Sequence, residues 1–255
     1  MRLKSKIEIK FDHWKKANNQ HGRQAFSRFI MLSFLDGLQS SNSDFVFKGG
    51  NLLWHYIKTP RETIDLDLAT QTLGSHLEIK IEIEKAIQLF NEVDFSILDF
   101  KEIYNEEGIG STFTLGFKTS SGQTNQFSLD IVYTLPTDIF IIKSTISGAP
   151  SKSASIENII ADKLSASHKF KSGNTRMKDY DDLWRISRSD LKINSQKLRT
   201  ILNNRSIPVE LESGWIKYLE ESWKRHSRLY KDIPKDLEVI FNEINEWTRQ
   251  ILEYR

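Results

Sequence analysis

The spacing of apolar residues predicts a first helix over residues 23–38, where they recur every three or four positions. A polar run at residues 40–44 then breaks this pattern. Residues 45–47 form a short apolar run typical of a strand, and the two glycines after it lead into a short helix that stops before Pro60. Residues 63–69 alternate between polar and apolar, which predicts a strand with two aspartates on one face.

The middle of the chain continues with one further helix and three strands. The helix is expected over residues 77–91. The strands are expected over residues 95–104, 111–118 and 126–133. Residues 120–123, Ser-Ser-Gly-Gln, suit the turn of a hairpin between the last two strands.

The pattern changes in the last hundred residues. Pro136 and Pro150 mark a connecting segment, and from about Ser155 the chain has helical spacing to its end. Ser155 is the expected N-cap of the first of these helices. We therefore expect an α+β protein with two domains: residues 1–150 with a mixed β-sheet core flanked by helices, and residues 151–255 with a helical C-terminal region.

Composition narrows the possible classes of protein. The 36 Lys and Arg residues nearly balance the 34 Asp and Glu residues, which argues against nucleic-acid binding by bulk charge alone. Cysteine is absent, so disulfides, thiol nucleophiles and Cys–zinc sites are excluded. No apolar stretch has the length of a signal peptide or of a membrane span, and we expect a soluble cytoplasmic protein without a membrane partner.

Three aspartates on predicted strands are candidates for a metal site. Asp65 and Asp67 lie two residues apart on one strand, so both side chains project from the same face. Two such carboxylates repel each other unless a cation joins them, and oxygen ligands favour Mg²⁺. Asp130 lies on another predicted strand and would add a third carboxylate if the strands are neighbours. The alternative is a solvated sheet face without an ion.

The glycine pair before this strand is a candidate phosphate site. Gly49 and Gly50 lie between a strand and the start of a helix, where glycines allow a phosphate to approach the backbone and N–H groups are available. Asn51 would cap the helix or hydrogen-bond a phosphate. A simple turn between strand and helix is the alternative.

Two charged groups occur in the helical region. Lys163 lies on a mostly apolar helix, and Asp179 and Asp182 share one helical face with Arg176 nearby. Either the aspartates pair with Lys163 and Arg176 in a purely structural network, or they orient these cations toward a triphosphate. A second group, the basic cluster Lys224, Arg225, His226 and Arg228, is a candidate RNA contact or a solvated helix face.

Taken in order, these segments resemble the motifs of a known family. They read KGGNLL at residues 48–53, RETIDLDL at 61–68, Asp130, KLSA at 163–166 and RMKDYDDL at 176–183. The set is similar to the AbiEii/AbiGii toxin family of the DNA polymerase β-like nucleotidyltransferase superfamily. The resemblance implies a nucleotidyltransferase-type fold with a helical C-terminal part.

The resemblance also implies roles for individual residues. The catalytic set would be Asp65, Asp67, Asp130, Lys163 and Asp179, and its first three members would bind Mg²⁺. The nucleotide-binding set would be Lys48, Gly49, Gly50, Asn51, Arg61, Lys163, Arg176, Lys178 and Asp182. Asn51 departs from the family pattern, which usually has Thr or Ser there, but all three side chains can donate a hydrogen bond to phosphate.

The expected function is Mg²⁺-dependent transfer of a nucleotide from an NTP. The resemblance implies a toxin of a bacterial toxin–antitoxin or phage-defence system, an RNA acceptor such as the tRNA 3′ end, and a cognate antitoxin protein. Two alternatives stay open. The chain would be a non-catalytic nucleotide-binding module acting through a protein partner, or a nucleotidyltransferase whose acceptor is a small molecule.

Overall fold

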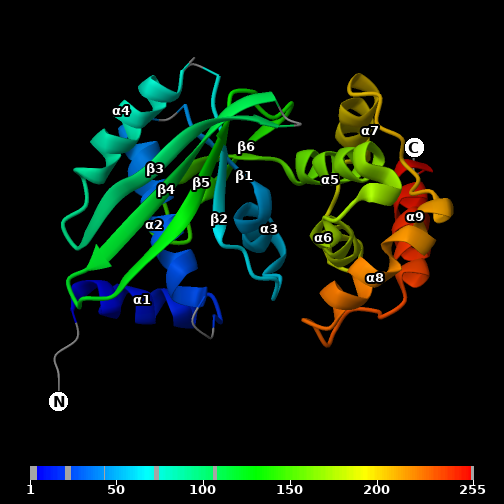
Figure 1. Cartoon of the computed structure of the whole chain (residues 1–255), viewed down its shortest axis with the longest axis horizontal. Coiled ribbons are helices and arrows are strands. Elements are labelled where there is room, and N and C mark those ends of the chain that lie inside the picture. Colours follow the sequence, from blue (N-terminus) through cyan, green and yellow to red (C-terminus); the bar gives the residue numbers. More distant parts are fainter. Residues whose placement is uncertain (1–4, 21–23, 43, 72–74, 106–107, 254–255) are drawn as a thin grey trace. The chain divides into compact units, whose positions relative to one another are not determined.

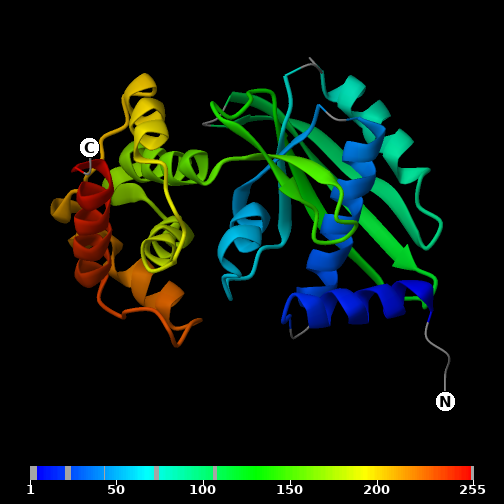
Figure 2. The ribbon, with the colours of Figure 1, turned by 180° about the vertical axis from the view of Figure 1, so that it is seen from behind.

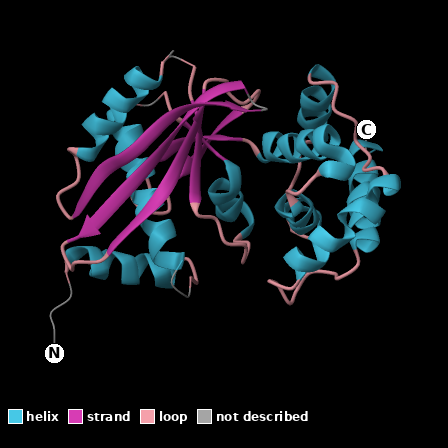
Figure 3. Ribbon diagram, in the orientation of Figure 1, coloured by secondary structure: helices cyan, strands magenta, loops and turns pink. Residues whose placement is uncertain are grey.

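The N-terminal part of the protein is built on a mixed β-sheet. The computed structural model describes residues 5–20, 24–42, 44–71, 75–105 and 108–253. The chain divides into two compact units, Met1–His55 with Pro60–Ala154 and Tyr56–Thr59 with Ser155–Arg255. Among the described residues, all strands belong to the first unit, as the colouring in Figure 3 shows.

Within the described residues, one seven-stranded sheet has the order β3-β4-β5-β2-β1-β7-β6. The strands are β1 (Val46–Lys48), β2 (Asp65–Ala69), β3 (Val93–Asn105), β4 (Gly108–Thr119), β5 (Thr124–Val132), β6 (Ile139–Lys143) and β7 (Pro150–Ala154). β2 pairs with β5 and β1 with β7 in parallel, whereas the other neighbours are antiparallel. The predicted α+β class with a mixed sheet is confirmed.

Helices accompany this sheet in the first unit. They are α1 (Lys6–Ala17), α2 (Gln24–Ser41), α3 (Gly49–Ile57) and α4 (His76–Ile87). Capping boxes begin α1 and α4, with Ser5 and Ser75 as the N-cap residues. α2 packs against α4 and also contacts β5 and β7. Figures 1 and 2 show α2 running along one face of the sheet with α1 at its end.

The core of the first unit lies between α2 and the sheet. Leu66 and Leu68 of β2 and Leu129 and Ile131 of β5 are fully buried. Phe34 of α2 packs on aromatic rings of the sheet and of the loop that precedes β3. Its ring centroid lies 5.1 Å from that of Phe95. Since side chains alternate along a strand, burial of these leucines turns the polar residues of β2 and β5 to the other face.

The second unit is helical. Its helices are α5 (Ile156–Phe170), α6 (Met177–Ser187), α7 (Ser195–Asn204), α8 (Ile216–Ser227) and α9 (Leu237–Glu253), with 3₁₀ turns at Lys171–Gly173 and Ser213–Trp215. Ser155 is the N-cap of α5, as predicted, and accepts a hydrogen bond from the Asn158 backbone. Trp223 and Phe241 are buried, so these aromatic residues of the C-terminal region form core.

The structure corrects several boundaries. The segment between Pro136 and Pro150, predicted as a connection, contains the strand β6, and the strand β7 begins at Pro150 and runs into the region predicted to be helical. The helix predicted over residues 77–91 ends at Ile87, and the strand predicted to begin at residue 63 begins at Asp65. The hairpin turn at residues 120–123 is confirmed by the Gly122 N–H, which donates to the Thr119 carbonyl at 2.9 Å. Arg23, where the first helix was expected to start, lies outside the described residues.

Among the helices of the described segments, none combines the length and the apolar character that crossing a bilayer requires.

The first unit ends at Ala154, whereas the domain boundary was expected at residue 150.

Candidate active site

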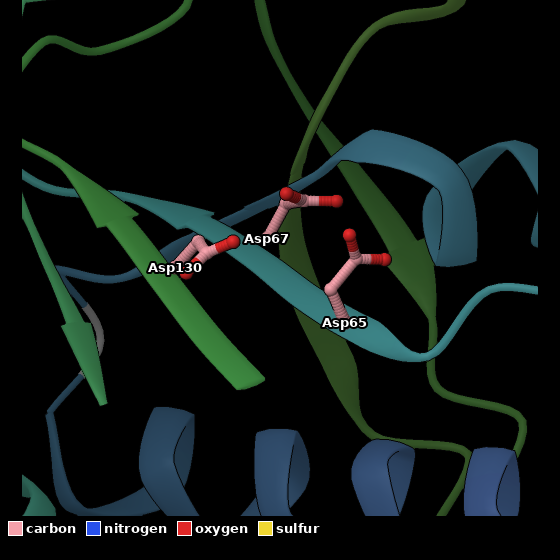
Figure 4. A group of neighbouring side chains, drawn as sticks. All are labelled: Asp65, Asp67 and Asp130. Atoms are coloured by element: carbon pink, nitrogen blue, oxygen red, sulfur yellow. The ribbon is translucent and has the colours of Figure 1, made fainter. Parts of the chain in front are cut away.

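Two parallel strands bring three aspartates together. In the register of β2 with β5, Asp67 lies beside Asp130 and Asp65 lies beside Ser128. Figure 4 shows the three carboxylates projecting to the same side of the two strands. Carboxylate oxygens of Asp65, Asp67 and Asp130 all lie within 4.8 Å of one another. The expected meeting of Asp130 with the other two is therefore found in the structure.

The environment of this triad suits a hard divalent cation. All three residues are half-buried, so their carboxylates are reachable from solvent. Ser128 Oγ donates to Asp130 Oδ1 at 3.0 Å, which orients that carboxylate. Three oxygen ligands at this separation repel each other and are drawn together by a bound cation. Within the described part of the chain, these aspartates form the one group of three or more acidic, His or Cys side chains that can hold a metal ion.

The glycine pair lies directly beside the triad. Gly49 begins α3 with a φ of +72°, a conformation that disfavours other residues. Gly50 follows in the first turn, where a Cβ would lie 2.4 Å from Arg61 Nη2 and 2.8 Å from Thr63 Oγ1. The first N–H groups of a helix have no carbonyl partner one turn earlier, and they attract anions. The missing side chains therefore allow Asp67 to pack against Gly49 and Arg61 and Thr63 to pack against Gly50.

Lys48 ends β1 next to this site. It lies opposite Asp67 in the antiparallel register of β1 with β2. Directly opposed residues of paired strands share one face of the sheet, so Lys48 lies on the face of the carboxylates. The sequence prediction placed Lys48 with the nucleotide, and its position beside Asp67 is compatible with that role.

Asn51 is not a helix cap, which corrects one of its two expected roles. It is the third residue of α3, and its side chain is fully buried. The Asn51 amide nitrogen donates to the Asp65 carbonyl at 2.6 Å, and its Oδ1 accepts from Arg28 Nε at 3.1 Å. Any contact of Asn51 with a nucleotide would thus use its backbone N–H. Arg61, the other predicted nucleotide-binding residue nearby, is buried beside Gly50.

In the second unit, Lys163 of α5 lies between two carboxylates of α6. Its Nζ donates to Asp179 Oδ1 at 3.2 Å and to Asp182 Oδ2 at 2.6 Å. Arg176 Nε donates to Asp179 Oδ2 at 2.8 Å. Of the pairings left open by the sequence, the structure thus has Asp179 paired with both cations and Asp182 paired with Lys163. Burial alone would raise the pKa of Asp179, but the charges of Lys163 and Arg176 outweigh it, and the pKa lies below its usual value.

A second ionic network, which the sequence analysis did not anticipate, joins α6 to α8 and to Asp232 in the same unit. Asp181 is fully buried and accepts from Arg185 Nε at 2.7 Å. Its other oxygen lies 2.9 Å from His226 Nε2 on α8. Arg185 also donates to Asp232 Oδ2 at 2.5 Å. The signal in the sequence was the i, i+4 spacing of Asp181 and Arg185 on one helix.

A basic hollow of about 410 Å³ lies between the start of α6 and α8. The residues that line it are Thr175, Arg176, Met177, Lys178, Ser222, Arg225 and His226. Arg225 donates to Ser222 Oγ at 3.3 Å, and among the described residues neither Arg225 nor Lys178 forms a salt bridge. Of the predicted basic cluster, Arg225 and His226 reach this hollow.

Comparison with known proteins identifies the family. The family described as "Nucleotidyl transferase AbiEii toxin, Type IV TA system" matches residues 33–243, which include the triad, the glycine pair and the Lys163 network. The chain belongs to the AbiEii toxin family. It is accordingly a nucleotidyltransferase, and membership implies an NTP substrate and an antitoxin counterpart. This confirms the resemblance drawn from the ordered motifs.

Solved structures agree with the AbiEii assignment at the level of the fold. One, named "putative nucleotidyltransferase" from H. pylori, has a TM-score of 0.61 and 17% identity, covering 91% of this chain and 96% of its own. Another, JHP933 from Helicobacter pylori, has a TM-score of 0.59 and 17% identity, covering 92% and 94%. The comparison with curated proteins gives no match.

Arg28 is the site residue that the sequence analysis missed. It lies on α2, between the buried residues Ala25 and Leu32 of the apolar face, and is itself buried. A charged residue on an apolar helical stripe was the available signal. In this AbiEii family member, Arg28 is hydrogen-bonded to Asn51, which joins it to the glycine pair and to β2.

Proposed function

We propose that this protein is a Mg²⁺-dependent nucleotidyltransferase that transfers NMP from an NTP to an RNA acceptor such as the tRNA 3′ end. The observation that carries the proposal is the triad of Asp65, Asp67 and Asp130, within 4.8 Å of one another beside the start of α3. Carboxylates and a glycine-rich helix start supply the two things that this reaction needs, cation ligands and a phosphate cradle.

The metal would be held by all three aspartates. Oxygen ligands of this charge favour Mg²⁺ over softer cations. When bound, Mg²⁺ supplies positive charge to the phosphate oxygens and to the leaving group.

The triphosphate would lie along the glycine pair. Backbone N–H groups of Gly49, Gly50 and Asn51 would donate to its β- and γ-phosphates. Lys48 lies on the same face as Asp67 and would add a positive charge. Within the second unit, the residues that the family motifs predict to bind nucleotide are Lys163, Arg176, Lys178, Asp179 and Asp182.

The chemical step is an in-line displacement at the α-phosphorus. The acceptor hydroxyl oxygen forms a bond to this phosphorus while the bond to the bridging oxygen of the β-phosphate breaks, and pyrophosphate leaves. The hydroxyl proton passes to the Asp130 carboxylate. Ser128 holds Asp130 Oδ1 through a hydrogen bond of 3.0 Å, which would keep the second oxygen oriented for this transfer.

The basic hollow supports an RNA acceptor. Lys178 and Arg225 carry charge there that no salt bridge among the described residues neutralises. Hydroxyl groups of Thr175 and Ser222 lie among these cations and can donate to phosphate oxygens. A backbone phosphate of the acceptor is therefore our proposed occupant. We place the reaction in the cytoplasm, where NTPs and tRNA occur, and assign the protein the toxin role in a toxin–antitoxin or phage-defence system.

The test is incubation of the protein with each α-labelled NTP, Mg²⁺ and total bacterial RNA, followed by gel separation. We expect label in one RNA class with a preferred NTP, and none with Asp65→Ala or Asp67→Ala. Asp94→Ala serves as the matched control, because Asp94 is an exposed carboxylate on β3 of the same sheet. Asp94→Ala should keep full transfer.

The outcome also decides between the alternatives. Label that appears on a small molecule, with RNA unlabelled, would replace the RNA acceptor and keep the chemistry. Mg²⁺-dependent binding of an NTP without any product would favour a non-catalytic module that acts through a protein partner. Transfer that persists in Asp65→Ala and Asp67→Ala would contradict the site itself.

A further inference from the structure

Arg28 is a buried cation that connects three segments around the glycine pair. Its side chain extends from α2, with 5% of its surface exposed. Nε donates to Asn51 Oδ1 at 3.1 Å, Nη1 to Gln20 Oε1 at 2.8 Å and Nη2 to the Arg61 carbonyl at 3.2 Å. The guanidinium also lies 4.8 Å from the centre of the Trp54 ring. One planar group thus fixes the geometry of several chain segments at once.

The surroundings of Arg28 make this arrangement costly. Its hydrogen-bond acceptors are neutral, and within the described residues Arg28 forms no salt bridge. Burial and the nearby Arg61 lower the pKa of Arg28 to about 10, and Glu62 offsets this in part. Burial of a cation whose partners are all neutral carries a desolvation penalty, so the geometry of Arg28 is a candidate for a role other than stability.

The contacts of Asn51 indicate that use. Asn51 accepts from Arg28 with Oδ1 and donates with its amide nitrogen to the Asp65 carbonyl at 2.6 Å. Asn51 belongs to the first turn of α3, immediately after the glycine pair, and Asp65 is the first residue of β2. A continuous path of hydrogen bonds therefore runs from α2 through the proposed phosphate cradle to a proposed metal ligand.

The third bond of Arg28 reinforces the same path. It holds the Arg61 backbone, and the Arg61 guanidinium fills the space where a side chain on Gly50 would lie. Gln20, in contrast, belongs to the segment between α1 and α2, and its bond to Arg28 leads away from the site.

We infer that Arg28 is a positioning residue, which through Asn51 and Arg61 sets the glycine pair at a fixed distance from the Asp65 end of the carboxylate triad. The role of this geometry in NTP transfer rests on the proposed function. Outer-sphere partners that orient metal ligands typically change metal affinity or activity by about 10- to 100-fold when they are removed. Arg28 would act in this way without touching the substrate.

The experiment compares Arg28→Gln with Gln20→Ala, which removes one hydrogen bond from the same guanidinium on the side away from the site. Hydrogen exchange followed by mass spectrometry reports on residues 49–53 and 65–69, and titration with Mn²⁺ followed by electron paramagnetic resonance reports on the triad. We expect Arg28→Gln to accelerate exchange in both segments and to weaken Mn²⁺ binding by about tenfold or more. Gln20→Ala should match the parent protein in both readouts.

Arg28→Lys separates charge from geometry. It keeps the positive charge but lacks the planar fork, so it should behave as Arg28→Gln does. If exchange in the two segments and Mn²⁺ affinity are unchanged in Arg28→Gln, or change equally in Gln20→Ala, the positioning role is overturned. Absence of nucleotide transfer in the parent protein would overturn the proposed function alone, because exchange and Mn²⁺ affinity are measured without NTP.

A second variant covers the case in which Arg28→Gln does not fold. Asn51→Asp keeps a hydrogen-bond acceptor for Arg28, and its negative charge strengthens the interaction with the Arg28 guanidinium. The aspartate carboxylate cannot donate to the Asp65 carbonyl. We expect faster exchange in residues 65–69 with protection retained in residues 49–53. Unchanged protection of residues 65–69 in Asn51→Asp would overturn the path from Arg28 to the triad.

Discussion

Gly49 lies so close to Asp67 that a methyl group on its Cα would come within 1.9 Å of the Asp67 Oδ2 atom. Gly49 is thus packed directly against Asp67 of the carboxylate triad. A side chain at position 49 cannot be accommodated unless Asp67 moves, and the Gly49 φ of +72° adds strain for any residue with a Cβ.

Gly49→Ala is therefore expected to abolish nucleotide transfer while the protein still folds. The matched control is Gly122→Ala, because Gly122 has a similar φ of +84° and no atom within 4 Å of its Cβ position. Both variants should lose about 1–2 kcal/mol of unfolding free energy from the left-handed conformation, and Gly49→Ala should lose more because Asp67 must move. Thermal denaturation measures the loss of stability in each variant, and the labelled-NTP assay checks that activity falls only in Gly49→Ala.

Neutralising one carboxylate should have opposite effects with and without metal. In the metal-free protein, Asp65→Asn removes the repulsion between carboxylates that lie within 4.8 Å of each other. We therefore expect its free energy of unfolding to rise by about 1 kcal/mol, the repulsion at a water-like dielectric. Addition of Mg²⁺ should raise the Tm of the parent protein and leave that of Asp65→Asn nearly unchanged. Differential scanning fluorimetry across a Mg²⁺ series measures both effects. An equal Mg²⁺ response of the two proteins would place the metal elsewhere.

Loss of the Lys163 charge should destabilise the second unit. Lys163→Met leaves the buried Asp179 and Asp182 without this cation, and breaking a buried pair of this kind costs about 3–5 kcal/mol. Lys224→Met, on the exposed surface of α8, should leave denaturant stability nearly unchanged. Urea unfolding followed by circular dichroism gives the comparison. A small effect of Lys163→Met would show that this network contributes little to the fold.

Acid should weaken the same network. The pKa of Asp179 is depressed in the folded protein relative to its ordinary 3.8, since Lys163 and Arg176 outweigh the effect of burial. Its ionised form therefore stabilises the fold above pH 3.8, and this contribution is lost as the pH falls toward and through the folded-state pKa. We expect the Tm difference between the parent protein and Asp179→Asn to narrow steadily below about pH 5. A difference that stays constant down to pH 3 would contradict this assignment.

Binding of RNA should depend on the basic hollow. Arg225→Gln removes a charge that lines it, and we expect weaker binding and a salt dependence whose logarithmic slope falls by about one. Lys224→Gln is the control, since Lys224 is the preceding residue of α8, is paired with Glu221 at 3.0 Å and does not line the hollow. Fluorescence anisotropy with labelled tRNA over a range of salt concentrations measures both slopes. Equal slopes in the two variants would exclude the hollow as the contact.

Local pattern predicted those parts of the site that depend on neighbouring residues. Alternation in β2 placed Asp65 and Asp67 on one face, and the glycine pair marked the start of α3. The position of Asp130 required knowledge of which strands pair and in which register, which local spacing does not contain. Only the parallel pairing of β2 with β5 in the folded protein brings Asp130 beside Asp67.

Two further features lay beyond local pattern for physical reasons. β7 reads Pro-Ser-Lys-Ser-Ala, without the apolar alternation of a strand, and it is held in the sheet by its neighbours β1 and β6. Arg28 was assigned to a helix correctly, but its role depends on contacts with Gln20, Asn51 and Arg61 that only the tertiary fold creates.

The parallel pairing of β2 with β5 also has a consequence for synthesis of the chain. Asp65 and Asp67 emerge from the ribosome well before Asp130, because β3 and β4 lie between them in the sequence. The triad closes only when the β3–β4–β5 meander has formed and its last strand has docked beside β2, a non-local step that forms late in folding. A nascent chain in which β5 has not yet paired with β2 would therefore carry the glycine pair without a complete metal site.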